Sequence, residues 1–465
     1  MQLILLIAES LLLLAGLLTG HLWAAVGIGA GLVYLLISLQ NPELAWALVW
    51  LAFPFSIETL FPGGIALHVP TEPMILIALL AWGARALAGQ PVMRFPTSEL
   101  NLPLAALGVA ALLSALLGLE PLVGIKAWLA IAIYVVFGYA FRLSAWNGPS
   151  RIDRFVPWIV GSAALWGLYG TLHVVAAGVS LRVAYGAARP FFVEHGVYAA
   201  YLAMILPMSV VYAMERRGRA GVLYGAASIA IALGIVFSLT RAAWVSLAIV
   251  LPPTLFLWGG WRRILTPLVP AAVLALALAL VVPATRSEQS LGRHVESIGN
   301  ASDPSNLERL NRWIAAVGMA KDHPLLGVGV GAYPDAYHLY RRKIFFTELV
   351  YQRMGAHSEA FRLLAEMGLI GALAACWLLL ATFRTGMKAF FATRDTATRA
   401  VTLSVLAGLA TFCLHGLFRT YFDLEKVAVP FWAGLGVIAA AGSAHRTGNP
   451  RSPRSTLGVA PERTA

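Results

Sequence analysis

His357 is the side chain in this sequence best suited to proton transfer. It stands in the segment 354–359, MGAHSE, directly before a long apolar stretch. A histidine at the edge of an apolar segment can titrate near neutral pH and act as a general base. A histidine kept there only for structural reasons is the alternative, and this segment alone does not decide between them.

A set of arginines could bind an anion close to that base. Arg241 lies between two apolar stretches with almost no connection between them, and an arginine at membrane depth costs about 2.5–3.5 kcal/mol on insertion scales. Arg309 and Arg312 lie three apart, on one side of a helix, and Arg189 precedes another apolar stretch. Guanidinium groups match phosphate oxygens in bidentate fashion, which favours a pyrophosphate as the ligand. For Arg241 the alternative is an interfacial arginine whose side chain reaches lipid headgroups.

These arginines could also take the place of a metal ion. A bound pyrophosphate needs positive groups around its negative charge. The segments assigned below to the outer face contain no Asp-x-Asp pair, and Asp423 and Glu425 are the nearest approach. We therefore expect neither a metal nor another cofactor.

The composition indicates which elements must position these residues. Of the 465 residues, 59% are hydrophobic and 12% are charged, with a mean hydropathy of +0.76, whereas about 25% of the residues in a soluble domain are charged. Soluble enzymes and disordered regulators are excluded, and two cysteines provide no disulfide framework. The sequence predicts an all-α polytopic integral membrane protein.

A membrane-spanning helix needs about 20 mostly apolar residues. Because several windows are short and Phe53-Pro54-Phe55 interrupts the third, we expect 12 to 14 spans. The windows cover 2–19, 22–39, 43–60, 72–89, 100–118, 122–141, 155–178, 195–214, 220–238, 242–259, 264–283, 362–383, 399–418 and 426–443.

The distribution of Lys and Arg predicts the orientation. Basic residues in short connections concentrate on the cytoplasmic side of membrane proteins. Alternating spans put the clusters at 216–219, 262–263 and 384–399, and the basic tail, on one common side. We assign that side to the cytoplasm, with both termini there and the segment 284–356 outside. The four domains are then membrane helices at 1–283, a large periplasmic loop at 284–356, membrane helices at 357–443, and a disordered cytoplasmic tail at 444–465.

The large loop should contain helices of its own. Asn306 can cap a helix over 307–320, whose apolar face would be formed by Leu307, Leu310, Ile314 and Val317. A glycine-punctuated turn follows at 324–333, and a second helix is expected at 335–346. The basic run 341–343 near its end indicates a solvated or headgroup-facing surface.

Four motifs in order resemble those of the O-antigen ligase and polymerase superfamily. They are Arg241 within SLTRA, the Arg312-Trp313 pair, PLLGVG at 324–329, and HSE at 357–359 followed by EMGLIG at 366–371. The resemblance is strongest over about 190–440. It implies an all-helical protein, usually of twelve spans. It also implies a periplasmic, metal-independent reaction that takes glycans from undecaprenyl diphosphate and inverts the anomeric centre.

The resemblance also implies roles for some of these residues. Arg241 and Arg312 match arginines thought to bind the donor diphosphate, and His357 matches the histidine thought to deprotonate the acceptor hydroxyl. Arg189 and Arg309 are added because of their location. His195 stands where many relatives have asparagine, which makes it a second candidate for a titrating group.

The implied activity is that of an O-antigen ligase in the bacterial inner membrane. Its partners would be the undecaprenyl-diphosphate-linked donor, the lipid A–core acceptor and membrane lipids, with no nucleic acid. An O-antigen polymerase and a protein O-oligosaccharyltransferase are alternatives from the same superfamily. A polyprenyl-linked glycan transporter is an alternative of a different class, but the sequence lacks the repeat symmetry typical of transporters.

Overall fold

The computed structural model describes residues 22–61, 65–90, 97–141, 149–260, 304–341 and 355–446. The expected spans at 2–19 and 264–283, the first part of the large loop, and the tail beyond residue 446 lie outside the described residues, as do Arg342 and Lys343 of the basic run.

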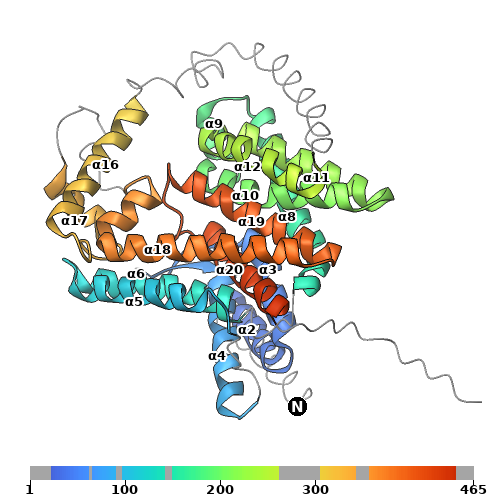
Figure 1. The fold of residues 1–465 in the computed structure, drawn as a ribbon, viewed down its shortest axis with the longest axis horizontal. Coiled ribbons are helices and arrows are strands. Elements are labelled where there is room, and N and C mark those ends of the chain that lie inside the picture. Colours follow the sequence, from blue (N-terminus) through green and yellow to red (C-terminus); the bar gives the residue numbers. More distant parts are fainter. Residues whose placement is uncertain are drawn as a thin grey trace, which may run out of the picture.

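The described chain is built almost entirely of helices (Figure 1). Eight of the helices in these ranges are long and apolar enough to cross a membrane, and three shorter helices are also apolar. This architecture confirms the all-α polytopic class. The helices are α2 (Leu22–Gln40), α3 (Pro42–Ala52), α4 (Thr71–Leu87), α5 (Asn101–Leu117), α6 (Pro121–Val135), α8 (Val156–Ala176), α9 (Leu181–Tyr185), α10 (His195–Glu215), α11 (Gly218–Phe237), α12 (Arg241–Gly259), α16 (Pro304–Asp322), α17 (Tyr333–Tyr340), α18 (Glu359–Ala392), α19 (Thr396–Gly416) and α20 (Glu425–Arg446).

The third predicted span is wrong in its second half. Helix α3 ends at Ala52, a 3-10 turn covers Phe53–Phe55, and the chain then forms an antiparallel hairpin of β1 (Ile57–Phe61) and β2 (Ile65–Val69). Ile57 pairs with Val69 in this hairpin. Pro54, within Phe53-Pro54-Phe55, ends the helix because proline has no backbone N–H to donate.

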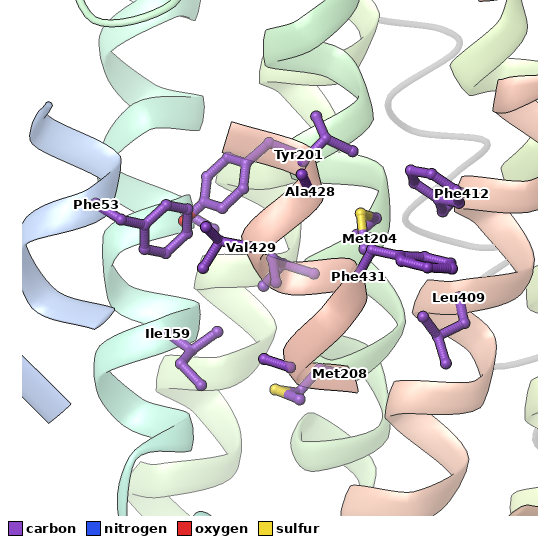
Figure 2. Close-up of a cluster of buried hydrophobic side chains, with 14 of the residues drawn as sticks. Phe53, Ile159, Tyr201, Met204, Met208, Leu409, Phe412, Ala428, Val429 and Phe431 are labelled. Atoms are coloured by element: carbon purple, nitrogen blue, oxygen red, sulfur yellow. The ribbon is translucent and has the colours of Figure 1, made fainter. Parts of the chain in front are cut away.

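Helix α10 lies at the centre of the bundle. It packs against α8, α11, α12, α19 and α20, and most of its side chains are buried. In Figure 2, Tyr201 of α10 lies against Phe53, whereas Met204 of α10 lies beside Phe431 of α20. A helix that is apolar on all sides belongs in such an interior, which explains why α10 needs no polar face.

The connections that carry the candidate residues lie at one end of the bundle, which we call the site end. They are the connections between α9 and α10, between α11 and α12 and between α19 and α20, and the turn before α18. Leu119, after α5, donates a backbone hydrogen bond to Val328 at 2.8 Å. Ser56, before β1, donates to Glu425 at 2.7 Å. Figure 1 draws α5 and α18 side by side, with α16 and α17 beyond the same end of both.

Helix α18 is broken at Gly368, and the turn after α16 fills the break. Gly368 has a φ of 60° inside the helix. Val328 N donates to Ala365 O at 2.9 Å, and Leu369 N donates to Pro324 O at 2.8 Å. A Cβ at Gly327 or Gly368 would overlap the backbone of the opposite segment. The motifs PLLGVG and EMGLIG are therefore two sides of one backbone-paired joint.

The helices of the large loop differ from the sequence expectations. Helix α16 begins at Pro304, so Asn306 lies inside it and is not its cap. Helix α17 ends at Tyr340, and Arg341 is extended, so the expected helix over 335–346 is shorter there. The apolar face predicted for α16 is also wrong, because Leu310 and Val317 are exposed whereas Glu308, Arg312 and Met319 are buried.

Candidate functional site

His357 lies in a tight turn at the start of α18. Its φ of 51° falls in the left-handed region, which is uncommon for a residue with a side chain. Ala356 before it is fully buried. Ser358 after it is extended, and its hydroxyl accepts a hydrogen bond from the Phe361 N–H at 3.5 Å as the N-cap of α18. The turn thus presents a half-buried imidazole at the helix N-terminus.

Helix α16 faces this turn with a buried ion pair. The Arg312 side chain is 0% exposed, and its Nε and Nη2 donate to Glu308 Oε1 at 2.8 and 2.6 Å. Its Nη1 donates to the Gly355 carbonyl at 2.9 Å. The guanidinium also lies 5.5 Å from the centre of the Tyr337 ring. Arg312 therefore joins α16, α17 and the His357 turn.

The surroundings keep His357 neutral. Burial and, after it, the charges of Arg312 and Arg309 together lower the pKa of His357 to about 4, against a smaller opposing effect of Glu308. At neutral pH the ring is unprotonated and can accept a proton. The pKa shift also shows that Arg309, Arg312 and His357 lie within electrostatic range of one another.

Helix α18 carries a second buried network directly after His357. Arg362 binds Glu359 at 2.8 Å and Glu366, one helical turn further on, at 3.5 Å. The other oxygen of Glu359 accepts hydrogen bonds from the backbone N–H groups of Tyr421 and Phe422. Glu359 therefore anchors the connection between α19 and α20 to the start of α18.

His195 and Arg241 lie together at the site-end tips of α10 and α12. His195 Nδ1 lies 2.8 Å from the Ser238 carbonyl and 3.3 Å from the Thr240 hydroxyl. The His195 ring packs on Tyr185, with 4.1 Å between ring centres. Arg241 is the half-buried first residue of α12. The short connection between α11 and α12 thus brings Arg241 and His195 to one place.

Arg189 lies in the connection before α10 and is exposed. Its Nε donates to the Val193 carbonyl at 3.2 Å, and its own carbonyl accepts a hydrogen bond from Tyr169 at 3.4 Å. Both contacts hold the segment between α9 and α10 in place and leave the side chain at the surface.

The connection between α19 and α20 joins the two groups of residues. Arg419 forms an ion pair with Glu194, the residue before His195. Tyr421 donates to the Gly196 carbonyl at 3.4 Å and lies 3.0 Å from His415 Nε2. Together with the Glu359 contacts, these bonds link the tip of α10 to the start of α18.

Sequence reasoning did not identify Glu308, Glu359 and Arg419 as part of this arrangement. Glu308 precedes Arg309 and Glu359 lies two residues after His357, and this nearness was the available signal. Arg419 lies far from every predicted site residue in the sequence, so no such signal existed for it. Among the described residues, no group of three or more His, Cys, Asp or Glu side chains could hold a metal ion. Of the nearest acidic pair, Glu425 is buried against Ser56 and Lys426.

Residues 226–376 match the family model described as O-antigen ligase. The matched segment contains Arg241, Arg309, Arg312 and His357 as well as the turn that fills the break in α18. Arg189 and His195 lie before it. No curated protein sequence matches the chain.

Proposed function

We propose that the chain acts as a member of the O-antigen ligase superfamily, whose family model matches residues 226–376, and that it transfers O-antigen glycan from undecaprenyl diphosphate to lipid A–core oligosaccharide. The observation that carries the proposal is the position of His357 at the start of α18, in a turn that Arg312 of α16 holds through the Gly355 carbonyl. We assign the site end to the periplasmic face of the bacterial inner membrane and both termini to the cytoplasm. Membrane lipids surround the bundle, and nucleic acid is not among the proposed partners.

The proposed step is a direct displacement with inversion. A hydroxyl oxygen of the acceptor attacks the anomeric carbon, on the face opposite the diphosphate, while the bond from that carbon to the diphosphate oxygen breaks. The acceptor proton passes to His357, and undecaprenyl diphosphate leaves with the bonding electron pair. General base assistance of this kind contributes about 10²–10⁴-fold to a rate.

The arginines supply the charge that a departing diphosphate needs. Arg189, Arg241 and Arg309 are proposed ligands of the diphosphate, because fixed cations near a leaving group stabilise its developing charge. Arg312 adds positive charge next to His357. These side chains make a metal ion unnecessary in the proposed step. His195 is a secondary candidate for a titrating group, beside Arg241.

Binding of the donor should also raise the pKa of His357. A bound diphosphate places negative charge near Arg309 and opposes the effect of the arginines on His357. The pKa of His357 in the donor complex would then lie above its value in the free protein, which makes the ring a better base at the moment of transfer.

The lipopolysaccharide banding pattern of a deletion strain tests the proposal. Loss of a ligase removes all capped lipopolysaccharide while long lipid-linked polymer accumulates. Loss of a polymerase instead leaves core with a single repeat, and an unchanged pattern with unglycosylated protein would indicate a protein glycosyltransferase. Complementation with the wild-type chain should restore the ladder, and His357→Ala at the same expression level should not.

A further inference from the structure

The Arg312-Trp313 pair of α16 holds the His357 turn from both sides. Arg312 binds the Gly355 carbonyl, two residues before His357. Trp313 stacks on Phe361, four residues after it, with ring centres 5.0 Å apart and planes 15° apart. The contacts enclose the segment in which His357 takes its left-handed conformation. Such a conformation persists where the surroundings fix it on both sides.

The guanidinium of Arg312 is already used by the protein. Each of its three nitrogens donates to a protein acceptor, two of them to Glu308 and one to Gly355. The Glu308 side chain is 7% exposed and that of Arg312 is 0% exposed. Because the Arg312 side chain is fully buried, a diphosphate could reach this guanidinium only if the groups packed around it moved. Displacing the carboxylate would leave a buried charge without its partner, which is strongly destabilising.

Helix α17 completes the enclosure of Arg312. The Tyr333 hydroxyl donates to the Arg312 carbonyl at 2.8 Å, and the Tyr337 ring lies against the guanidinium. Arg309 differs from Arg312, because it is only half-buried. Its charge acts on both His357 and Tyr421, so it lies on the side of α16 that faces the connection between α19 and α20.

We propose that Arg312, balanced by Glu308 and assisted by Trp313, is a positioning residue that fixes His357, and that Arg309 is the residue of α16 that meets the donor diphosphate. This assignment rests on the proposed function and revises the expected role of Arg312. Arg312 acts on the reaction through the Gly355 carbonyl and does not touch the substrate.

Glu308→Gln separates the two roles of Arg312. If Arg312 bound the diphosphate, removing the competing negative charge of Glu308 would free the guanidinium and tighten donor binding. If Arg312 positions His357, the same change weakens the contact of Arg312 with the Gly355 carbonyl and slows transfer. Glutamine keeps the shape of the side chain and an oxygen acceptor, so this variant is the mildest way to weaken the pair. Arg312→Lys is its counterpart on the other side of the pair.

The experiment uses full-length protein in lipid nanodiscs, with undecaprenyl diphosphate as the binding probe and glycan transfer as the kinetic readout. We expect Glu308→Gln and Arg312→Lys each to lower kcat at least about tenfold, with the probe Kd within about threefold of wild type. Arg309→Ala should raise the probe Kd at least about tenfold. A tenfold weaker Kd in Arg312→Lys together with a tighter one in Glu308→Gln would overturn the proposal.

A spectroscopic readout keeps this test separate from that of the proposed function. The NMR signal of His357 in protein with 13C-labelled histidine should shift in both Glu308→Gln and Arg312→Lys, and it should stay unchanged in Arg384→Lys, a substitution in the distal part of α18. An unchanged His357 signal in both pair variants would overturn the positioning role. If the wild type neither bound the probe nor transferred glycan, the proposed function would be wrong. The NMR signal of His357 would still show whether Arg312 positions this residue.

Discussion

The two groups of arginines at the site end are held in different ways. On α16 and α18, Arg312 and Arg362 are buried and bound to glutamates, at 2.6 and 2.8 Å. Near α10, Arg189 is exposed and Arg241 is half-buried at a helix start. Buried, carboxylate-paired arginines fix the backbone around His357. The arginines near the surface are placed to meet an anion that comes and goes.

The largest expected effect is that of removing the base. His357→Ala should lower the transfer rate by about 10²–10⁴-fold, because His357 is the proposed acceptor of the hydroxyl proton. The protein should still insert and melt as the wild type does. His338→Ala is the matched control, since His338 is exposed on α17 and should leave the rate unchanged. Near-wild-type transfer by His357→Ala would contradict the assignment.

The joint between α16 and α18 can be broken without touching a charged residue. Gly368→Ala combines a positive φ with backbone overlap and should lower the free energy of unfolding by about 3 kcal/mol. Gly161→Ala is the control, because a Cβ there meets nothing within 4 Å. Thermal melting of the two purified variants measures the difference. Equal melting temperatures would mean that the turn at 324–329 does not support α18.

The arginines near α10 should affect donor affinity in the order of their burial. Arg241→Ala should lower kcat/KM about 10- to 100-fold, as expected for a lost charge-assisted hydrogen bond. Arg189→Ala should cost only about two- to fivefold, because an exposed charge is screened by solvent. Arg182→Ala, exposed on α9, serves as the control. Steady-state kinetics with varied donor give the order, and a larger effect at Arg189 would reverse the comparison.

The pH dependence of transfer tests whether burial and the neighbouring arginines lower the pKa of His357. The pKa of His357 is lowered to about 4, and protonation below that pH removes the base. The acid limb of kcat/KM, which reports the free enzyme, should therefore lie near pH 4 and not near the usual histidine value. The limb of kcat should lie at higher pH, since the bound diphosphate raises the pKa. If the acid limbs of kcat/KM and kcat both lay near pH 6.5, burial and the arginines would not lower the pKa of His357 as described.

The sequence predicted the membrane helices well because a run of apolar residues is a local signal. The starts of α10 and α12 fall within a residue of the expected windows. The hairpin at 57–69 was missed because Ile57, Leu60 and Ile65 continue the apolar run after the helix has ended.

The candidate site was only partly predictable. The pairing of Arg362 with Glu366 is local, because residues four apart lie side by side on a helix. The buried face of α16 was assigned wrongly, because Leu310 and Val317 are exposed and the interior face carries Glu308 and Arg312 together with small residues and Met319. The contact of Arg312 with Gly355 and the anchoring of Tyr421 by Glu359 depend on long-range packing, for which a single sequence has no signal.

A structure of the protein in a nanodisc with bound undecaprenyl diphosphate tests the central claim most directly. We predict that the diphosphate contacts Arg241 and Arg309 at the site end, that His357 lies beside it, and that Arg312 remains on Glu308 and Gly355. A diphosphate bound away from both Arg241 and Arg309, or one bound to Arg312, would contradict this prediction.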